Sequence, residues 1–353
     1  MLERRSILAS AALSLVAIIG LAGSAAAGSV QITETGSSLL YPLFQEWAPA
    51  YQQKTGVQIT PQSTGSGTGI SDAENATVNI GASDAYVSTA LEAQHPNLLN
   101  IPLAVSAQQV MYNLPGLNKR HLKLNGPVLA GIYDGQIKNW NDAAIRKLNP
   151  GVKLPNLPVV PIHRADGSGD TFLFTQYLSF TTPSWNHGPS FGTSISWPSV
   201  PGSISATGNQ GMVQQLTAYQ GGVAYVGVSW LTPALKDGLG EAMVENRAGQ
   251  FLLPTNQTIG AAVAGMAKHT PKTERISLIF SGGKNSYPII NYEYAIVPKT
   301  QPNAQVAAAV KAFLLWAADP KNGNSPQYLT PVHFLPLPSN VLPLSRAQIN
   351  EIN

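Results

Sequence analysis

The chain has 353 residues, of which 44% are apolar and only 11% are charged, and its formal net charge is +3. The length favours two domains, and the small positive excess, with no run of Lys and Arg, excludes a typical nucleic-acid-binding surface. The chain has no Cys, which excludes disulfides, thiol catalysis, thiolate metal sites and a lipid on an N-terminal Cys. Its six His are scattered without the i, i+4 spacing of a helical metal site.

Residues 1–27 predict a secretory signal peptide. Arg4 and Arg5 precede an apolar stretch centred on residues 15–21, and three Ala residues follow at 25–27. This order is that of a cleaved leader, with Gly28 as the first mature residue. An uncleaved anchor is the alternative, although the apolar run is short for a span of about 20 residues. We therefore expect a periplasmic or secreted protein.

The first part of the chain alternates short strands and helices. Strands are predicted at Val30–Thr33, Val57–Thr60 and Val78–Gly81, and a helix is predicted from near Leu39, where apolar residues recur at helical spacing. Pro49 is expected to kink this helix. Such alternation indicates an α/β fold, in which ligands bind at the carboxyl ends of the strands.

A second region begins near Val110. We expect helix over residues 128–148, interrupted by turns, then a strand at Val159–Ile162 and a helix through residues 173–178. Residues 181–210 resemble an ordered loop, and Val223–Val228 resembles a strand. A late strand at residues 292–297 and a helix over 306–317 follow. Periodicity does not decide which region this tail joins.

Three polar turns each precede a predicted helix, and they are the candidate binding elements: Thr35–Ser38, Ser63–Gly69 and Arg164–Thr171. Free backbone N–H groups at a helix start favour an anion, and Arg164 can add a charge-assisted contact to an oxyanion. Each turn alone is equally typical of a helix cap. Asp166 is a candidate to orient the Arg164 guanidinium, or else a solvated loop carboxylate.

Asp84 follows the third predicted strand and would lie near the same anion. A carboxylate repels an anion unless the ligand carries a proton that the carboxylate can accept. Phosphate carries one near neutral pH and sulfate does not, so Asp84 would exclude sulfate. The alternative is that Asp84 caps a local turn, and spacing alone does not separate the two interpretations.

Catalytic motifs are weak in this sequence. Neither Ser66 nor Ser168 lies in a G-x-S-x-G elbow, and proximity of His163 to Ser168 does not make a triad. The glycine-rich loop lacks the Lys of a P-loop. No catalytic residue, metal or cofactor is expected.

At these positions the sequence resembles the periplasmic phosphate-binding protein of the bacterial phosphate-specific ABC transporter, and among its members it is most similar to the mycobacterial lipoprotein type. The resemblance spans Thr35 to about Leu344 and rests on the segments TGSSLLYPLFQEW, TGSGTGI, NIGASDAYVS, GQIKNWNDAAIRKLNPGVKLP and HRADGSGDTFLFTQYLS. It implies a type II two-lobed fold, with residues 28–108 plus 291–353 as the first lobe and 109–290 as the second.

The resemblance also implies a ligand set, a monomer, and an ABC permease as partner. The implied phosphate-binding residues are Ser38, Leu39, Ser66, Asp84, Arg164, Ser168, Gly169 and Asp170, with Asp166 holding Arg164. Many members have Thr where this chain has Asp170, which is either a second acceptor for ligand protons, as in the mycobacterial type, or only a helix cap. A secreted phosphatase-like enzyme and a surface adhesion protein remain alternative functions.

Overall fold

A computed structural model describes residues 30–353, so the predicted signal peptide lies outside the described residues. Within that range no helix has both the length and the apolar character needed to cross a membrane. Helices and strands alternate along most of the chain, which confirms the predicted α/β class.

One large sheet forms the centre of the molecule, with the strand order β2-β1-β3-β12-β4-β8-β6-β7 and β9 paired to β4. Strands β1, β2 and β3 are parallel to one another, as are β6, β7 and β8, whereas β12 and β4 run antiparallel to their neighbours. A small second sheet has the order β11-β10-β5. The strands are β1 Gln31–Gly36, β2 Gln58–Thr60, β3 Ile80–Ser83, β4 Leu98–Tyr112, β5 Lys123–Leu124, β6 Val160–Arg164, β7 Ile204–Ala206, β8 Gly222–Gly227, β9 Gly240–Glu241, β10 Met243–Glu245, β11 Phe251–Leu252 and β12 Ile290–Pro298.

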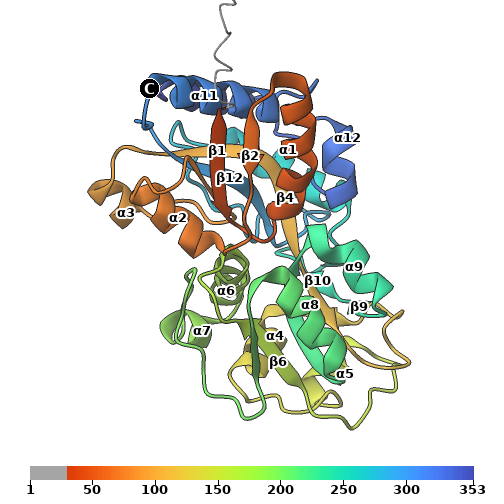
Figure 1. Cartoon of the computed structure of the whole chain (residues 1–353). Coiled ribbons are helices and arrows are strands. Elements are labelled where there is room, and N and C mark those ends of the chain that lie inside the picture. The colour runs from red at the N-terminus through yellow and green to blue at the C-terminus, as the bar shows by residue number, and fades with distance from the viewer. Residues whose placement is uncertain (1–29) are drawn as a thin grey trace, which may run out of the picture.

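Strand β4 joins the two groups of elements that Figure 1 shows above and below its centre. Residues 98–107, except Leu103 at a register shift, pair with β12, and residues 108–112 pair with β8. All fifteen of its residues are buried. A strand covered on both faces lacks the alternation that reveals half-buried strands, which is why the sequence did not show one strand running through the predicted region boundary near Val110.

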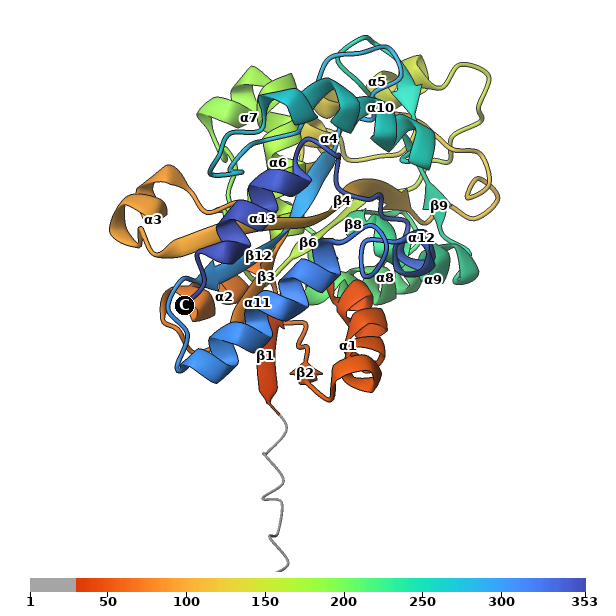
Figure 2. The same ribbon diagram turned by 90° about the horizontal axis from the view of Figure 1, so that it is seen from above.

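Helices cover both faces of the sheet. Figure 2 shows α11 and α13 lying across the strands of the first group. An aromatic cluster packs α11 against α1, with Trp47 meeting Phe313 edge to face at 6.1 Å. The helices are α1 Tyr41–Thr55, α2 Ser66–Glu74, α3 Thr89–Gln94, α4 Gly126–Tyr133, α5 Ala143–Leu148, α6 Gly169–Thr181, α7 Pro183–His187, α8 Gly208–Ala218, α9 Leu231–Lys236, α10 Asn256–Met266, α11 Ala304–Ala318, α12 Pro326–Leu329 and α13 Leu342–Asn350.

Three local predictions need correction. Helix α1 continues through Pro49, which lies in the middle of an unbroken fifteen-residue helix, so tertiary packing of its apolar face outweighs the lost hydrogen bond. Strand β3 begins two residues later than predicted, at Ile80. The segment 181–210 contains the short helix α7 and strand β7 rather than loop alone.

Candidate functional site

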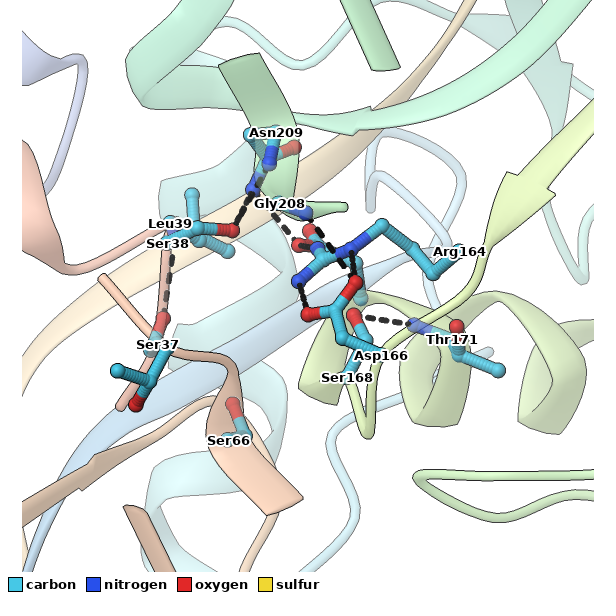
Figure 3. A network of polar contacts seen from close by, with 12 residues as sticks. Ser37, Ser38, Leu39, Ser66, Arg164, Asp166, Ser168, Thr171, Gly208 and Asn209 are labelled. Carbon is cyan, nitrogen blue, oxygen red and sulfur yellow. Dashed lines mark hydrogen bonds and ion pairs between the residues drawn. The ribbon is translucent and has the colours of Figure 1, made fainter. Parts of the chain in front are cut away.

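The three predicted polar turns meet where the two groups of elements face each other. They precede α1, α2 and α6, and the backbone N–H of Gly67 at the start of α2 donates to the carbonyl of Gly167 just before α6, at 2.9 Å. Figure 3 shows the side chains of these turns gathered in one network. The three turns therefore lie side by side in the folded chain, near the ends of strands β1 and β6.

Gly36 ends β1 and lets the chain pass close to β3. Its φ is +142°, and a Cβ there would lie 2.0 Å from the carbonyl oxygen of Ala82, so only glycine fits. Gly36 and Ala82 are partners in the parallel β1–β3 ladder. This register places Ser37 beside the end of β3, within reach of Asp84.

Gly169, the first residue of α6, provides the closest approach between the two sides. A Cβ on this residue would lie 2.4 Å from Oδ2 of Asp84 and 2.6 Å from Oγ of Ser66. The backbone at the start of α6 thus packs directly on those two predicted residues. Because the first N–H groups of a helix have no intrahelical acceptor, the α6 terminus directs donors toward them.

Arg164 is buried at the end of β6 and is held by two carboxylates. Its Nε donates to Oδ1 of Asp166 at 2.7 Å and its Nη2 pairs with Oδ2, which makes a bidentate contact. Its Nη1 donates to Oδ2 of Asp170 at 2.6 Å. Burial by itself would lower the pKa of Arg164, but the hydrogen bonds and charges of Asp166 and Asp170 raise it, so the guanidinium stays charged.

The predicted orienting role of Asp166 agrees with this geometry. Besides the two Arg164 contacts, its Oδ1 accepts from the backbone N–H of Gly208 at 3.1 Å, so α8 also fixes it. Burial raises the pKa of Asp166, but the hydrogen bonds and charge of Arg164 outweigh that effect and leave it below its ordinary value. Asp166 is therefore ionised and anchors the guanidinium.

Asp170 does more than cap α6. Its Oδ2 accepts from Nδ2 of Asn209 at 2.7 Å as well as from Arg164, and its Oδ1 accepts from Gln108 at 3.2 Å. Burial raises the pKa of Asp170 above its ordinary value despite the nearby Arg164 charge. This carboxyl therefore belongs to the network and is placed to titrate with the site.

Asn209, which sequence reasoning missed, links the two sides of the site. Its Nδ2 and its backbone N–H donate to Oγ of Ser38 at 2.9 and 3.0 Å, and its Oδ1 accepts from the N–H of Gly227 at 2.8 Å. Figure 3 shows it above Ser38. Its only sequence signal is its place at the start of a helix that follows a short strand.

Asp84 accepts hydrogen bonds from two serines. Ser37 donates to its Oδ1 and Ser66 donates to its Oδ2 at 3.3 Å, while its backbone N–H donates to Oγ of Ser66 at 3.1 Å. Burial and the charge of Asp170 raise the pKa of Asp84 to about 7, although the hydrogen bond from Ser37 acts in the opposite direction. Asp84 therefore takes up a proton more readily than an ordinary aspartate.

The remaining predicted residues are buried nearby and have local partners. The N–H of Leu39 donates to Oγ of Ser37 at 3.1 Å, and Oγ of Ser168 accepts from the N–H of Thr171 at 3.2 Å, as a helix cap does. Figure 3 shows Ser168 beside Asp166 and Leu39 beside Ser38. Ser37 was not predicted, although it contacts Asp84 while the predicted Ser38 contacts Asn209.

The arrangement suits a small oxyanion that carries a proton. It combines hydroxyl and N–H donors, one guanidinium and carboxylate acceptors, all withdrawn from solvent. Within residues 30–353 no group of three or more His, Asp or Glu is arranged to hold a metal ion. The ring of His163 stacks on Trp197 with ring centres 4.8 Å apart, and its Nδ1 lies 3.1 Å from the carbonyl oxygen of Arg164.

Comparisons with known proteins agree with this geometry. Residues 22–321 match the model of the PBP superfamily domain. The Phosphate-binding protein PstS of Pasteurella multocida is 34% identical over 317 residues, which cover 90% of this chain and 89% of that protein. The Phosphate-binding protein PstS 3 of Mycobacterium leprae is 28% identical over 299 residues, which cover 81% of this chain and 78% of that protein. A solved phosphate-binding protein from Stenotrophomonas maltophilia shares the fold with a TM-score of 0.68 at 20% identity, covering 90% of this chain and 94% of that one. The predicted two-lobed α/β fold is thereby confirmed, and the chain belongs to the PstS family of the PBP superfamily.

Proposed function

We propose that this chain is an exported, monomeric, non-enzymatic binding protein that captures inorganic phosphate between two lobes and delivers it to an ABC permease. One observation carries this proposal. Arg164, several hydroxyl and N–H donors and the carboxylate of Asp84 lie buried close together, at the junction of the two groups of elements. The names of the relatives described above, which are phosphate-binding proteins, support it.

The proposed roles follow from hydrogen-bonding chemistry. Ser38, Ser66, Ser168 and the N–H groups of Leu39 and Gly169 donate to phosphate oxygens, and Arg164 supplies positive charge. Asp84, and with it Asp170, accepts from hydroxyls that phosphate carries and sulfate lacks. A sulfate ion would face these carboxylates without a proton between them, which leaves a repulsion uncompensated.

We propose that the lobes comprise residues 28–108 plus 291–353 and residues 109–290, and that they open to exchange ligand. Only a few chain segments, including β4, pass between these parts, and few crossing segments are typical of a hinge. The contacts between them at the site are polar and small: Asn209 to Ser38, and the α6 terminus against Ser66 and Asp84. Opening breaks hydrogen bonds that water can replace.

The proposal is tested by calorimetric titration of the phosphate-stripped mature protein with phosphate and then with sulfate at neutral pH. We expect tight phosphate binding and no sulfate signal for the wild type, and sulfate binding in Asp84→Asn. Asp237→Asn, at an exposed helix end, is the matched control and should behave as the wild type.

Two results would contradict the proposal. A wild-type protein that binds neither ion is no phosphate carrier. Steady hydrolysis of a chromogenic phosphate ester that disappears in Asp84→Asn would favour the enzymatic alternative instead.

A further inference from the structure

A fully buried carboxyl group lies directly behind Asp84, and the phosphate-binding scheme above does not use it. This group belongs to Glu293 on β12. Strand β12 runs antiparallel to β3 with Tyr294 opposite Ser83, the residue before Asp84. The β12–β4 pairing changes register between Glu293 and Tyr294, and a bulge of this kind redirects a side chain.

The first carboxyl oxygen of Glu293 lies in a polar cluster with Ser106 and Asn291. Its Oε1 lies 2.5 Å from Oγ of Ser106 and accepts from Nδ2 of Asn291 at 2.9 Å. The same Ser106 hydroxyl lies 2.7 Å from Oδ1 of Asn291, which is also an acceptor. Ser106 has one hydrogen and can donate it to only one of these two acceptors.

The surroundings of the second oxygen of Glu293 require a proton on this carboxyl or on that of Asp84. Within residues 30–353 no N–H or O–H group donates to the buried Oε2, and the carboxyl of Glu293 lies within interaction range of that of Asp84. Two ionised carboxylates are both acceptors and cannot bond each other, so one of the pair carries a proton.

The surroundings decide which of the two acids holds it. Asp84 already receives hydrogen bonds from Ser37 and Ser66 and lies toward the charges of Arg164 and Asp170. Burial, followed by the charge of Asp84, raises the pKa of Glu293 well above its ordinary value. The proton therefore belongs to Glu293.

We propose that Glu293 is a positioning residue that remains protonated and donates a hydrogen bond to Asp84, which keeps Asp84 ionised and aimed at the ligand's hydroxyl. This inference rests on the proposed function and deepens it. Without the donor, Asp84 would take up a proton more readily, and a protonated Asp84 no longer distinguishes phosphate from sulfate. Glu293 thus controls anion specificity without touching the anion.

Two substitutions separate this role from simple structural support. Glu293→Gln keeps a neutral donor, and we expect its phosphate affinity within about threefold of the wild type and its sulfate exclusion intact. Glu293→Leu removes the donor, and we expect phosphate affinity to fall about ten- to a hundredfold, which is the range for a hydrogen bond to a charged group. Its sulfate binding should also persist to higher pH than in the wild type.

Other outcomes would overturn the proposal. If Glu293→Gln loses as much phosphate affinity as Glu293→Leu, the residue acts through its charge. If Glu293→Leu weakens binding but its phosphate-to-sulfate ratio and pH profile match those of the wild type, the role is only structural.

A measurement without ligand tests the proton itself. The infrared difference between wild type and Glu293→Gln, recorded on ligand-free protein at alkaline pH, should contain the carbonyl stretch of a protonated carboxylic acid. Absence of that band refutes the proposal even if Glu293→Leu does not fold. Failure of the wild type to bind phosphate would instead remove the proposed function and leave this result valid.

Discussion

Replacing Gly169 by Ala tests whether the closed arrangement is as tight as the contacts at the start of α6 indicate. The added Cβ would lie 2.4 Å from Oδ2 of Asp84, and 2.6 Å from both Cβ of Asp84 and Oγ of Ser66, whereas ordinary contacts begin at 3.4 Å. Rotation moves Oδ2 away, but Cβ of Asp84 is fixed to its backbone. The α6 terminus must therefore retreat by about 0.8 Å (3.4 − 2.6) from that atom.

This displacement of the α6 terminus raises the free energy of the closed state. Overpacking of well-packed sites costs about 1–3 kcal/mol, and if the open form does not bear that cost, the apparent phosphate affinity falls about five- to 150-fold. Helix α6 itself should not suffer, because Ala favours a helix over Gly by up to about 1 kcal/mol. We therefore expect weaker binding with an unchanged or raised melting temperature.

The assay is calorimetry for affinity together with small-angle scattering for the compaction that phosphate induces. Gly260→Ala, in the interior of α10 and with its nearest neighbour at 3.7 Å, is the matched control and should bind as the wild type. Wild-type affinity in Gly169→Ala would show that closure does not bring α6 against Asp84 and Ser66, and the site geometry would have to be revised.

Two further predictions concern residues that the sequence did not reveal. Asn209→Ala removes donors to Ser38 and Asp170, so phosphate affinity should fall about tenfold, and an unchanged calorimetric titration would show that this bridge does not support closure. Glu274 concerns stability, since burial raises its pKa from 4.5 to about 8, although Ser345 and Gln348 donate to it. The folded protein holds a proton on Glu274 to a higher pH than the unfolded chain does. The contribution of protonated Glu274 to the free energy of unfolding is therefore complete below pH 4.5 and is lost as the pH rises through about 8. Thermal unfolding should show the melting temperature of the wild type falling over that range more than that of Glu274→Gln, and parallel curves would refute the argument.

The parts of the fold that the sequence predicted are those with local signals. The strands β2, β6, β8 and β12 and the helices α6 and α11 were predicted within a few residues, because apolar spacing and turn residues mark them. The order of strands in the sheet, and the passage of one buried strand, β4, between two groups of elements, depend on pairing between distant segments. No periodicity within one segment encodes such pairing.

The site residues were also predicted where they are close in sequence and missed where they come from distant segments. Arg164, Asp166, Ser168 and Asp170 lie close together in the chain, and the prediction that Asp166 orients Arg164 agrees with the structure. Residues such as Asn209, by contrast, reach the site from later segments. A buried Asn at the start of a helix resembles an ordinary cap until its partners across the molecule are known.

The charge balance of the network links its residues to the kind of anion it would accept. Fully ionised, Arg164 with Asp84, Asp166, Asp170 and Glu293 would carry +1 − 4 = −3 in a buried region, and unpaired buried charge costs several kcal/mol per ion. Protons on some carboxyls reduce this burden, and Glu293 is best placed to keep one. Since Arg164 is already paired with two carboxylates, it offers little net attraction to a further anion. If the chain binds phosphate as proposed, its affinity comes mainly from hydroxyl and N–H donors. The carboxylates that stay ionised then favour an anion that carries a proton, because they can accept a hydrogen bond from it.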